Sequence, residues 1–255
     1  YRLLSAAQHR KLMKQITDAL GRDDFLIVGD MDLRKLRTLQ AAFREKGSLT
    51  PAQTAELEKL ITDVLDTAGG IQLGITELNR PSDGEYTSRY DTSFFDSCTS
   101  KALDKIMARP EYKDKILGFV VNQGYINHLS GMNHGEYGTF TLRNIMRRVL
   151  KHNPDYVLFF EWNEVNENTS FQPTVYSGQT TGRLIKYYSR LSKGKPFAPY
   201  AGDDVSIPDL TLSYRATLKP GEILRFELLN IPDGSPLRTI TAQLKLTDGA
   251  GKVLL

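Results

Sequence analysis

The segment Tyr156-Val-Leu-Phe-Phe-Glu-Trp-Asn-Glu164 passes from a short apolar run straight into acidic and amide side chains. An apolar run of this length, without helical spacing, is typical of a strand buried in a parallel sheet. Similar runs occur earlier in the chain, at residues 25–31, 70–77 and 116–121. Because helical patterns separate these runs, the sequence predicts repeated strand–helix units and a parallel sheet with helical crossovers.

Amphipathic helices are expected around these strands. The best marked follows Thr50 and Pro51, where Gln53 completes a capping box. Further helical patterns lie near residues 12–20, 101–108, 142–150 and 184–191. Four strand–helix units make up half of a (β/α)8 TIM-type barrel, and we expect the other half upstream of Tyr1. The alternative is a stand-alone, four-stranded doubly wound sheet, which the pattern alone does not exclude.

The composition of the chain changes after Pro199. Short alternating runs at 210–218, 223–229 and 240–246 are separated by turns rich in glycine and proline. These runs predict the start of an antiparallel β-sandwich. We therefore expect two domains, a partial (β/α) barrel carrying the catalytic site over residues 1–199 and a β-sandwich-like module over residues 200–255.

Composition and charge exclude several classes of function. The formal net charge is +3, from 33 basic and 30 acidic residues, and no run of Lys and Arg suggests a nucleic-acid partner. The glycine-rich motifs that bind nucleotide phosphates do not occur, so we expect no nucleotide cofactor. No apolar run approaches the roughly 18 residues that a membrane-spanning helix needs. Cys98 is the single cysteine, which we expect to be a small buried side chain.

The acidic segment is the strongest candidate for a catalytic site. Glu161, Glu164 and Glu167 recur every three residues at the end of an apolar strand, where crowded carboxylates lose hydration. If the chain turns just after Trp162, Glu164 and Glu167 become neighbours. Carboxyl groups about 5–5.5 Å apart suit retaining glycoside cleavage, and about 6.5–9.5 Å suits inversion. Trp162 and Asn163 would then contact a sugar. The alternative is a solvated acidic loop before the next helix.

The segment Asn163-Glu-Val-Asn-Glu-Asn-Thr-Ser-Phe-Gln-Pro173 resembles a family signature, Asn-Glu-Trp-x-Glu-Gly-Thr-x-x-Glu-Pro. That signature belongs to glycoside hydrolase family 99, the endo-α-mannosidase-like barrels. The resemblance implies that Glu164 is the general base and Glu167 the general acid. It also implies that the 2-hydroxyl of the sugar attacks, so that configuration is retained, and that no metal or other cofactor takes part.

Three positions depart from this signature. Val165 replaces Trp, Asn168 replaces Gly, and Gln172 replaces the third acid. The departures leave the identity of the substrate open and support an alternative, a glycan-binding or surface-polysaccharide-assembly protein on the same barrel.

Loops after the earlier strands supply further candidates, because ligands of parallel α/β folds bind at the carboxyl ends of the strands. The loop after residue 121 is rich in side chains that hydrogen-bond sugar hydroxyls, and the loop after residue 77 is long enough to form a wall of the site. The candidate substrate contacts in these loops and at the first strand are Asn122, Tyr125, His128, His134, Glu77, Tyr86 and Asp30. Each of them has an alternative role in loop structure. Asp32 is expected to cap the following helix.

The sequence therefore favours an endo-acting, retaining glycoside hydrolase on an α-linked, mannan-like oligo- or polysaccharide. A second alternative is a metal-dependent hydrolase that uses Asp30, His134 and Glu164. An extracytoplasmic location is implied by the family resemblance alone.

Overall fold

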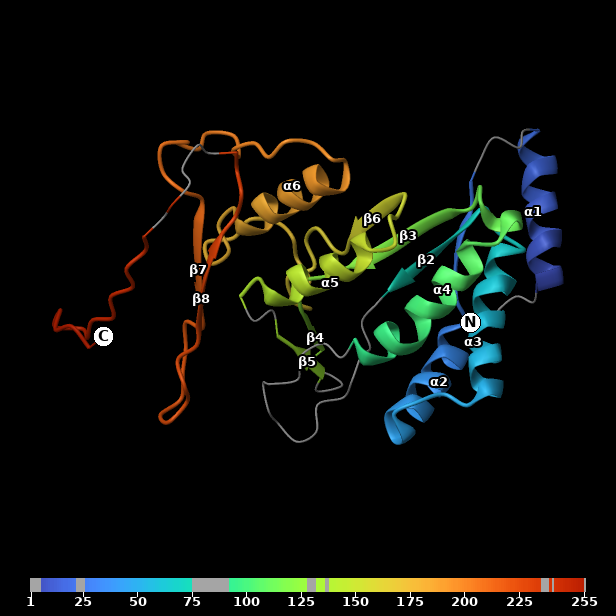
Figure 1. The fold of residues 1–255 in the computed structure, drawn as a ribbon, viewed down its shortest axis with the longest axis horizontal. Helices are drawn as coiled ribbons and strands as arrows, with labels where there is room; N and C mark the ends of the chain where they lie inside the picture. Colours follow the sequence, from blue (N-terminus) through green and yellow to red (C-terminus); the bar gives the residue numbers. More distant parts are fainter. Residues whose placement is uncertain are drawn as a thin grey trace. The chain divides into compact units, whose positions relative to one another are not determined.

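The computed structural model describes residues 6–21, 26–74, 92–127, 132–135, 138–234, 239 and 241–254. It contains two compact units, Tyr1–Gln172 and Pro173–Leu255 (Figure 1). The domain boundary expected after residue 199 falls within the second unit and stays a prediction. In the described part of the chain, no helix combines the length and apolarity that crossing a membrane requires.

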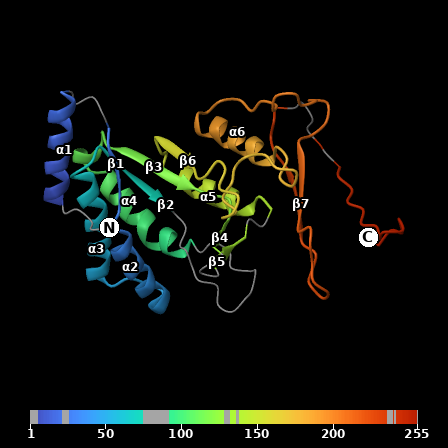
Figure 2. The same cartoon turned by 180° about the vertical axis from the view of Figure 1, so that it is seen from behind.

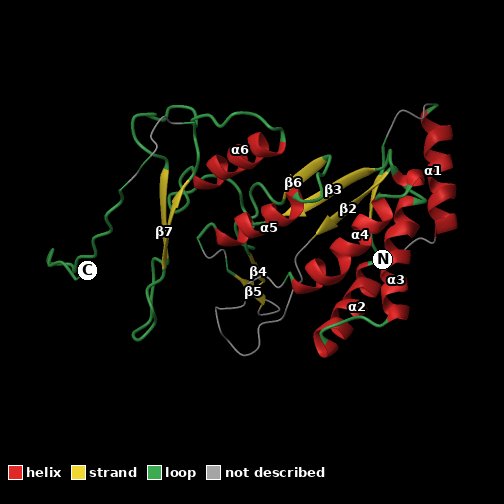
Figure 3. Ribbon diagram, viewed as in Figure 1, coloured by secondary structure: helices red, strands yellow, loops and turns green. Residues whose placement is uncertain are grey.

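A four-stranded parallel sheet forms the centre of the first unit. Its strands are β1 (Val28–Asp30), β2 (Gly70–Gly74), β3 (Ile116–Val121) and β6 (Tyr156–Phe159). They lie in the order β1-β2-β3-β6, and each neighbouring pair is parallel (Figure 3). The predicted α/β fold with a parallel sheet is confirmed, because all four predicted strands occur and pair in sequence order.

Helices separate the strands along the chain. They are α1 (Ala6–Leu20), α2 (Leu33–Lys46), α3 (Pro51–Leu65), α4 (Ser100–Met107) and α5 (Phe140–Leu150), with α6 (Thr180–Ser192) in the second unit. A π-helical turn, Phe95–Thr99, leads into α4, and a short 3-10 helix, Pro110–Tyr112, follows it. The predicted capping box of Thr50 and Gln53 is present at the start of α3.

Helix α2 was not predicted, although its two ends are clearly marked. The Asp32 side chain accepts hydrogen bonds from the backbone amides of Arg34 and Lys35. Gly47 ends the helix with a φ of 70°, in the left-handed region that favours glycine. The expectation that Asp32 caps a helix is therefore confirmed.

The two faces of the sheet differ in character. Ile71, Leu73, Phe119 and Val121 are buried on the face that α3, α4 and α5 cover (Figure 2). The alternate positions point to the opposite side, which we call the open face. It carries Asp30, Gln72, Gly118, Tyr156 and Leu158, and Leu158 is 44% exposed. The hydrophobic core of this unit thus lies between the sheet and the helices.

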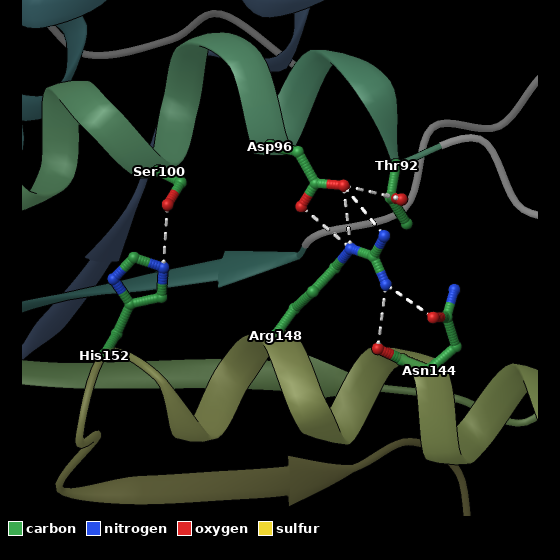
Figure 4. A network of polar contacts seen from close by, with 6 residues as sticks. All are labelled: Thr92, Asp96, Ser100, Asn144, Arg148 and His152. Carbon is green, nitrogen blue, oxygen red and sulfur yellow. Dashed lines mark hydrogen bonds and ion pairs between the residues drawn. The ribbon is translucent and has the colours of Figure 1, made fainter.

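His152 lies in the turn after α5, and its side chain is hydrogen-bonded to α4 on the helix-covered side of the sheet (Figure 4). Its Nδ1 lies 2.8 Å from Oδ1 of Asp104, and its Nε2 lies 3.1 Å from Oγ of Ser100. The imidazole ring also packs against Phe95 and Phe119, with ring centroids 5.7 Å apart in both cases. The side chain of His152 is 4% exposed, so it joins both helices to the core.

The structure differs from the predicted secondary structure in two segments. Part of the loop at 122–138 forms an antiparallel pair of short strands, β4 (Tyr125–Asn127) and β5 (Met132–His134). In the second unit, β7 (Leu210–Tyr214) pairs antiparallel with β8 (Phe226–Asn230), whereas residues 241–246 form no strand. Of the expected β-sandwich, the described residues contain one two-stranded antiparallel sheet.

We expect the substitution His152→Ala to destabilise the protein by about 2–4 kcal/mol. The change removes the packing of the ring against two phenylalanines and leaves Ser100 and Asp104 without their histidine partner. Urea denaturation followed by circular dichroism measures this loss. The control, Lys14→Ala, breaks an exposed ion pair with Asp18 on α1 and is expected to change stability by less than about 0.5 kcal/mol. Equal midpoints for the two variants would contradict the prediction.

Candidate functional site

The acidic segment forms a closed loop directly after β6. The backbone amide of Phe171 donates to the carbonyl of Glu161 over 2.9 Å, and that of Gln172 donates to the carbonyl of Trp162 over 3.0 Å. Inside the loop, residues 165–168 form a turn, and the amide of Thr169 donates to the carbonyl of Glu164 over 3.3 Å. We call residues 161–172 the motif loop. The chain bends at residues 162 and 163, and the turn follows at residues 165–168.

Both candidate acids lie at this turn. Glu164 precedes it and Glu167 lies within it, and each residue is half-buried. Trp162 is 64% exposed, with Asn163 exposed beside it. The motif loop is attached to the core by Phe171, which is buried and contacts Phe159 with ring centroids 5.5 Å apart. The motif loop therefore carries two glutamates and an exposed indole, and Phe171 anchors it to the hydrophobic core.

The loop after β3 lies beside the motif loop. The amide of Phe160 donates to the carbonyl of Val121 over 2.9 Å, so Asn122 and Glu161 leave neighbouring strands at the same edge. The side-chain amide of Gln123 then donates to the carbonyl of Ser170. Asn122 is half-buried here. These contacts hold the two loops together at the carboxyl ends of two neighbouring strands.

Tyr125 and His134 are brought opposite each other by the β4–β5 pairing. Tyr125 is half-buried, and the backbone of His134 forms part of β5. His128, Glu77 and Tyr86 lie outside the described residues. Of the candidates after β2 and β3, Asn122 and Tyr125 are therefore the ones with a described side chain.

Asp30 ends β1, two strands away from β3. Neighbouring strands lie about 4.8 Å apart, so the axes of β1 and β6 are about 14 Å apart. Partial burial raises the pKa of the Asp30 carboxyl, and a hydrogen bond from the side chain of Gln72 acts in the opposite direction. Strand pairing thus brings Asn122 to the motif loop and leaves Asp30 on another part of the same edge.

Two polar side chains of the open face were not predicted from the sequence. Gln72 and Tyr156 are hydrogen-bonded to each other over 2.9 Å although they are far apart in the chain. A polar residue in the middle of an apolar strand, as at Gln72, is the signal that could have indicated them. Gln123 was likewise part of a polar loop without being singled out.

The two candidate acids were compared with possible metal sites and with the cavities of the described residues. Among the described residues, no group of three His, Cys, Asp or Glu side chains could hold a metal ion. The first unit has a cavity of about 400 Å³ lined by Phe43, Cys98 and Lys101, and the second has one of about 460 Å³ around Arg183. Glu164 and Glu167 line neither of these cavities.

The contacts of His152 with Ser100 and Asp104 are those of a hydrolytic triad. These three residues line neither cavity, which favours a structural role.

We expect Gln123→Ala to loosen the motif loop. Losing one hydrogen bond to the Ser170 carbonyl should speed amide hydrogen exchange at Phe171 and Gln172 about five-fold. Hydrogen–deuterium exchange on peptides that cover residues 161–172 measures this change. The matched control, Gln53→Ala on α3, removes a capping contact elsewhere and should leave these peptides unchanged. Exchange at the wild-type rate in Gln123→Ala would contradict a connection between the two loops.

No protein-family model and no curated protein sequence matches the chain. Two solved structures of the GH99 endo-alpha-mannosidase from Bacteroides thetaiotaomicron are similar to it. One has 14% identity and a TM-score of 0.41, covering 76% of this chain and 64% of that chain. The other, in complex with BIS-TRIS-propane, has 13% identity and a TM-score of 0.40, covering 76% and 69%. The similarity therefore spans about two thirds of the length of these structures.

Proposed function

We propose that the chain is a glycoside hydrolase, endo-acting and retaining, that cleaves an α-linked, mannan-like glycan. The first unit would be part of a (β/α)8 barrel, with Glu164 and Glu167 as the reacting pair. A location outside the cytoplasm belongs to the same proposal, as do substrate contacts by Glu77, Tyr86 and His128.

The arrangement of the sheet supports a barrel over a doubly wound sheet. A doubly wound sheet reverses its strand order at a switch point, whereas β1, β2, β3 and β6 follow one another without reversal. Helices α3, α4 and α5 all cover the same face. In a barrel the helices form an outer ring and the opposite face lines the interior, which matches this distribution.

The single observation that carries the proposal is the geometry of the motif loop. Two glutamates lie at one turn, held by backbone hydrogen bonds, at the carboxyl end of a strand in a parallel sheet. This is the edge at which barrel enzymes bind their substrates. An exposed Trp162 beside the acids provides an apolar surface on which a sugar ring can lie.

The two glutamates would have different roles. Following the family resemblance, Glu164 takes the proton of the sugar 2-hydroxyl, whose oxygen attacks the anomeric carbon. Glu167 donates its proton to the leaving glycosidic oxygen as the glycosidic bond breaks, which leaves a 1,2-anhydro sugar. Water then opens this ring at the anomeric carbon, while Glu167 takes a proton from the water and Glu164 returns its proton to the 2-oxygen. Asn122, Asn163 and Tyr125 can exchange hydrogen bonds with other hydroxyls of the glycan.

Glycan binding without cleavage is the second candidate function. Its support is Gln172, an amide where the signature has a third acid, together with Val165 in place of Trp. Both side chains belong to the motif loop, so either change can alter how a glycan is held without removing the glutamate pair.

We expect Glu167→Gln and Glu164→Gln each to lower the rate of glycan cleavage by about 10²–10⁴-fold, because each removes a proton-transfer group. Release of reducing ends from an α-mannan measures the rate, and isothermal titration calorimetry measures binding. Folding and binding should stay close to those of the wild type.

The matched control is Glu56→Gln, on the exposed side of α3, which should cleave at the wild-type rate. Turnover near that of the wild type in both catalytic variants would rule out the proposed pair. Saturable binding with no reducing-end release by the wild-type protein would favour the second candidate function.

A further inference from the structure

Three polar side chains form a hydrogen-bonded row across the open face of the sheet. The hydroxyl of Tyr156 on β6 donates to Oε1 of Gln72 on β2 over 2.9 Å. The register places Gln72 beside Asp30 on β1, and a hydrogen bond from the Gln72 side chain lowers the pKa of the Asp30 carboxyl. We call these three residues the polar row. It joins the first strand of the sheet to the last.

The register of the sheet places the polar row on one level. Asp30 pairs with Gln72, Gln72 with Gly118, and Gly118 with Tyr156, so all four side positions point to the same face. Gly118 is required because a Cβ atom at this position would collide with the ring of Tyr156. The tyrosine therefore lies over β3 and reaches β2 through the space that the glycine leaves.

The direction of the hydrogen bonds fixes the role of each group. Oε1 of Gln72 accepts from Tyr156, so its Nε2 is the group that donates to Asp30. Burial raises the pKa of Tyr156, and the nearby charge of Asp30 raises it further, so the phenol keeps its proton at neutral pH. Asp30 is thus the acceptor at the end of the row, and its carboxylate retains further lone pairs.

Asp30 carries a negative charge with no cationic partner among the described residues. The salt bridges of these residues do not include it. Its neighbours in the row are a neutral amide and a neutral phenol. The nearby carboxylate of Asp32 accepts from two backbone amides at the start of α2. Asp30 is exposed at the end of β1, so its carboxylate can accept hydrogen bonds from additional neutral donors, such as the hydroxyls of a sugar.

We propose that Asp30 binds a pair of sugar hydroxyls on the open face of the sheet, and that Gln72 and Tyr156 are positioning residues which hold its carboxylate. The inference rests on the proposed function for the class of ligand. It adds a contact region on β1 and β2, separate from the motif loop on β6. It explains why polar groups and a glycine occupy a face that barrels usually fill with branched apolar side chains.

The test measures the affinity for an α-linked mannotetraose by isothermal titration calorimetry. We expect Asp30→Asn to weaken binding about ten-fold, because a charged acceptor is lost. Tyr156→Phe keeps the ring over Gly118 and removes the hydroxyl, and it should weaken binding about three-fold. Gln72→Met should act like Tyr156→Phe, so that the result does not depend on one variant folding well.

The matched control is Tyr112→Phe. It removes a tyrosine hydrogen bond of 2.7 Å, to Asp66 on the helix side of the sheet. Any loss of stability from a missing phenol should occur in this variant too, while its affinity for mannotetraose stays at the wild-type value. Unchanged affinity in Asp30→Asn, or equal losses in Tyr156→Phe and Tyr112→Phe, would overturn the inference.

A pH titration separates positioning from a structural role. Binding requires the carboxylate, so affinity should fall as the pH falls through the raised pKa of Asp30. The hydrogen bond from Gln72 lowers this pKa, so Gln72→Met should raise it and move the loss of binding to higher pH. The carboxyl carbon shift of Asp30, followed by NMR without ligand, reports the same change directly.

The two proposals fail in different ways. If Glu164→Gln and Glu167→Gln still cleave, the reaction is wrong and the Asp30 variants still decide the contact. If the wild-type protein does not bind mannotetraose, the ligand class is wrong in both proposals. An Asp30 carboxyl titration that is identical in the wild type, Gln72→Met and Tyr156→Phe would overturn the positioning roles.

Discussion

Strand β6 is held at the edge of the sheet by its parallel pairing with β3, from Gly118 opposite Tyr156 to Val121 opposite Phe159. The pairing continues one residue beyond the strand, where the amide of Phe160 donates to the carbonyl of Val121. This hydrogen bond fixes where the motif loop begins. Because the loop after β3 begins at the same place, the side-chain amide of Gln123 can donate to the backbone carbonyl of Ser170 in the motif loop.

The same pairing has a consequence on each face of the sheet. On the helix side it aligns Phe119 with the ring of Phe95, in the π-helical turn before α4, and with the imidazole ring of His152 in the turn after α5. On the open face it sets Tyr156 over Gly118, which makes the contact with Gln72 possible. A shift of one residue would turn every side chain to the other face and remove both arrangements. Packing and polar contacts therefore depend on a single register.

The sequence predicted what is local, and it missed what depends on pairing. Strand β3 and the capped start of α3 were predicted well, because an apolar run and a capping box are local signals. Helix α2 was missed although Asp32 and Gly47 mark its ends, because only Leu39 and Phe43 are buried on it and its apolar stripe is weak. The polar row could not be predicted, since Gln72 and Tyr156 come together only through the register of two intervening pairings. The spacing of the glutamates and the family signature indicated the motif loop. The hydrogen bond from Gln123 to Ser170 could not be predicted, because it joins two loops that are far apart in the sequence.

The three departures from the family signature differ in how they affect the backbone and the surface of the motif loop. Asn168 replaces a glycine and has a φ of 55°, and asparagine is among the few other residues that adopt this left-handed conformation readily. The backbone that the signature encodes is thus compatible with this sequence. Gln172 uses its backbone amide to close the loop, and that contact does not depend on its side chain. Val165 is 58% exposed, so exchanging Trp for Val removes a large surface without disturbing the core. The departures therefore leave the turn at the two glutamates intact and alter the exposed surface beside it.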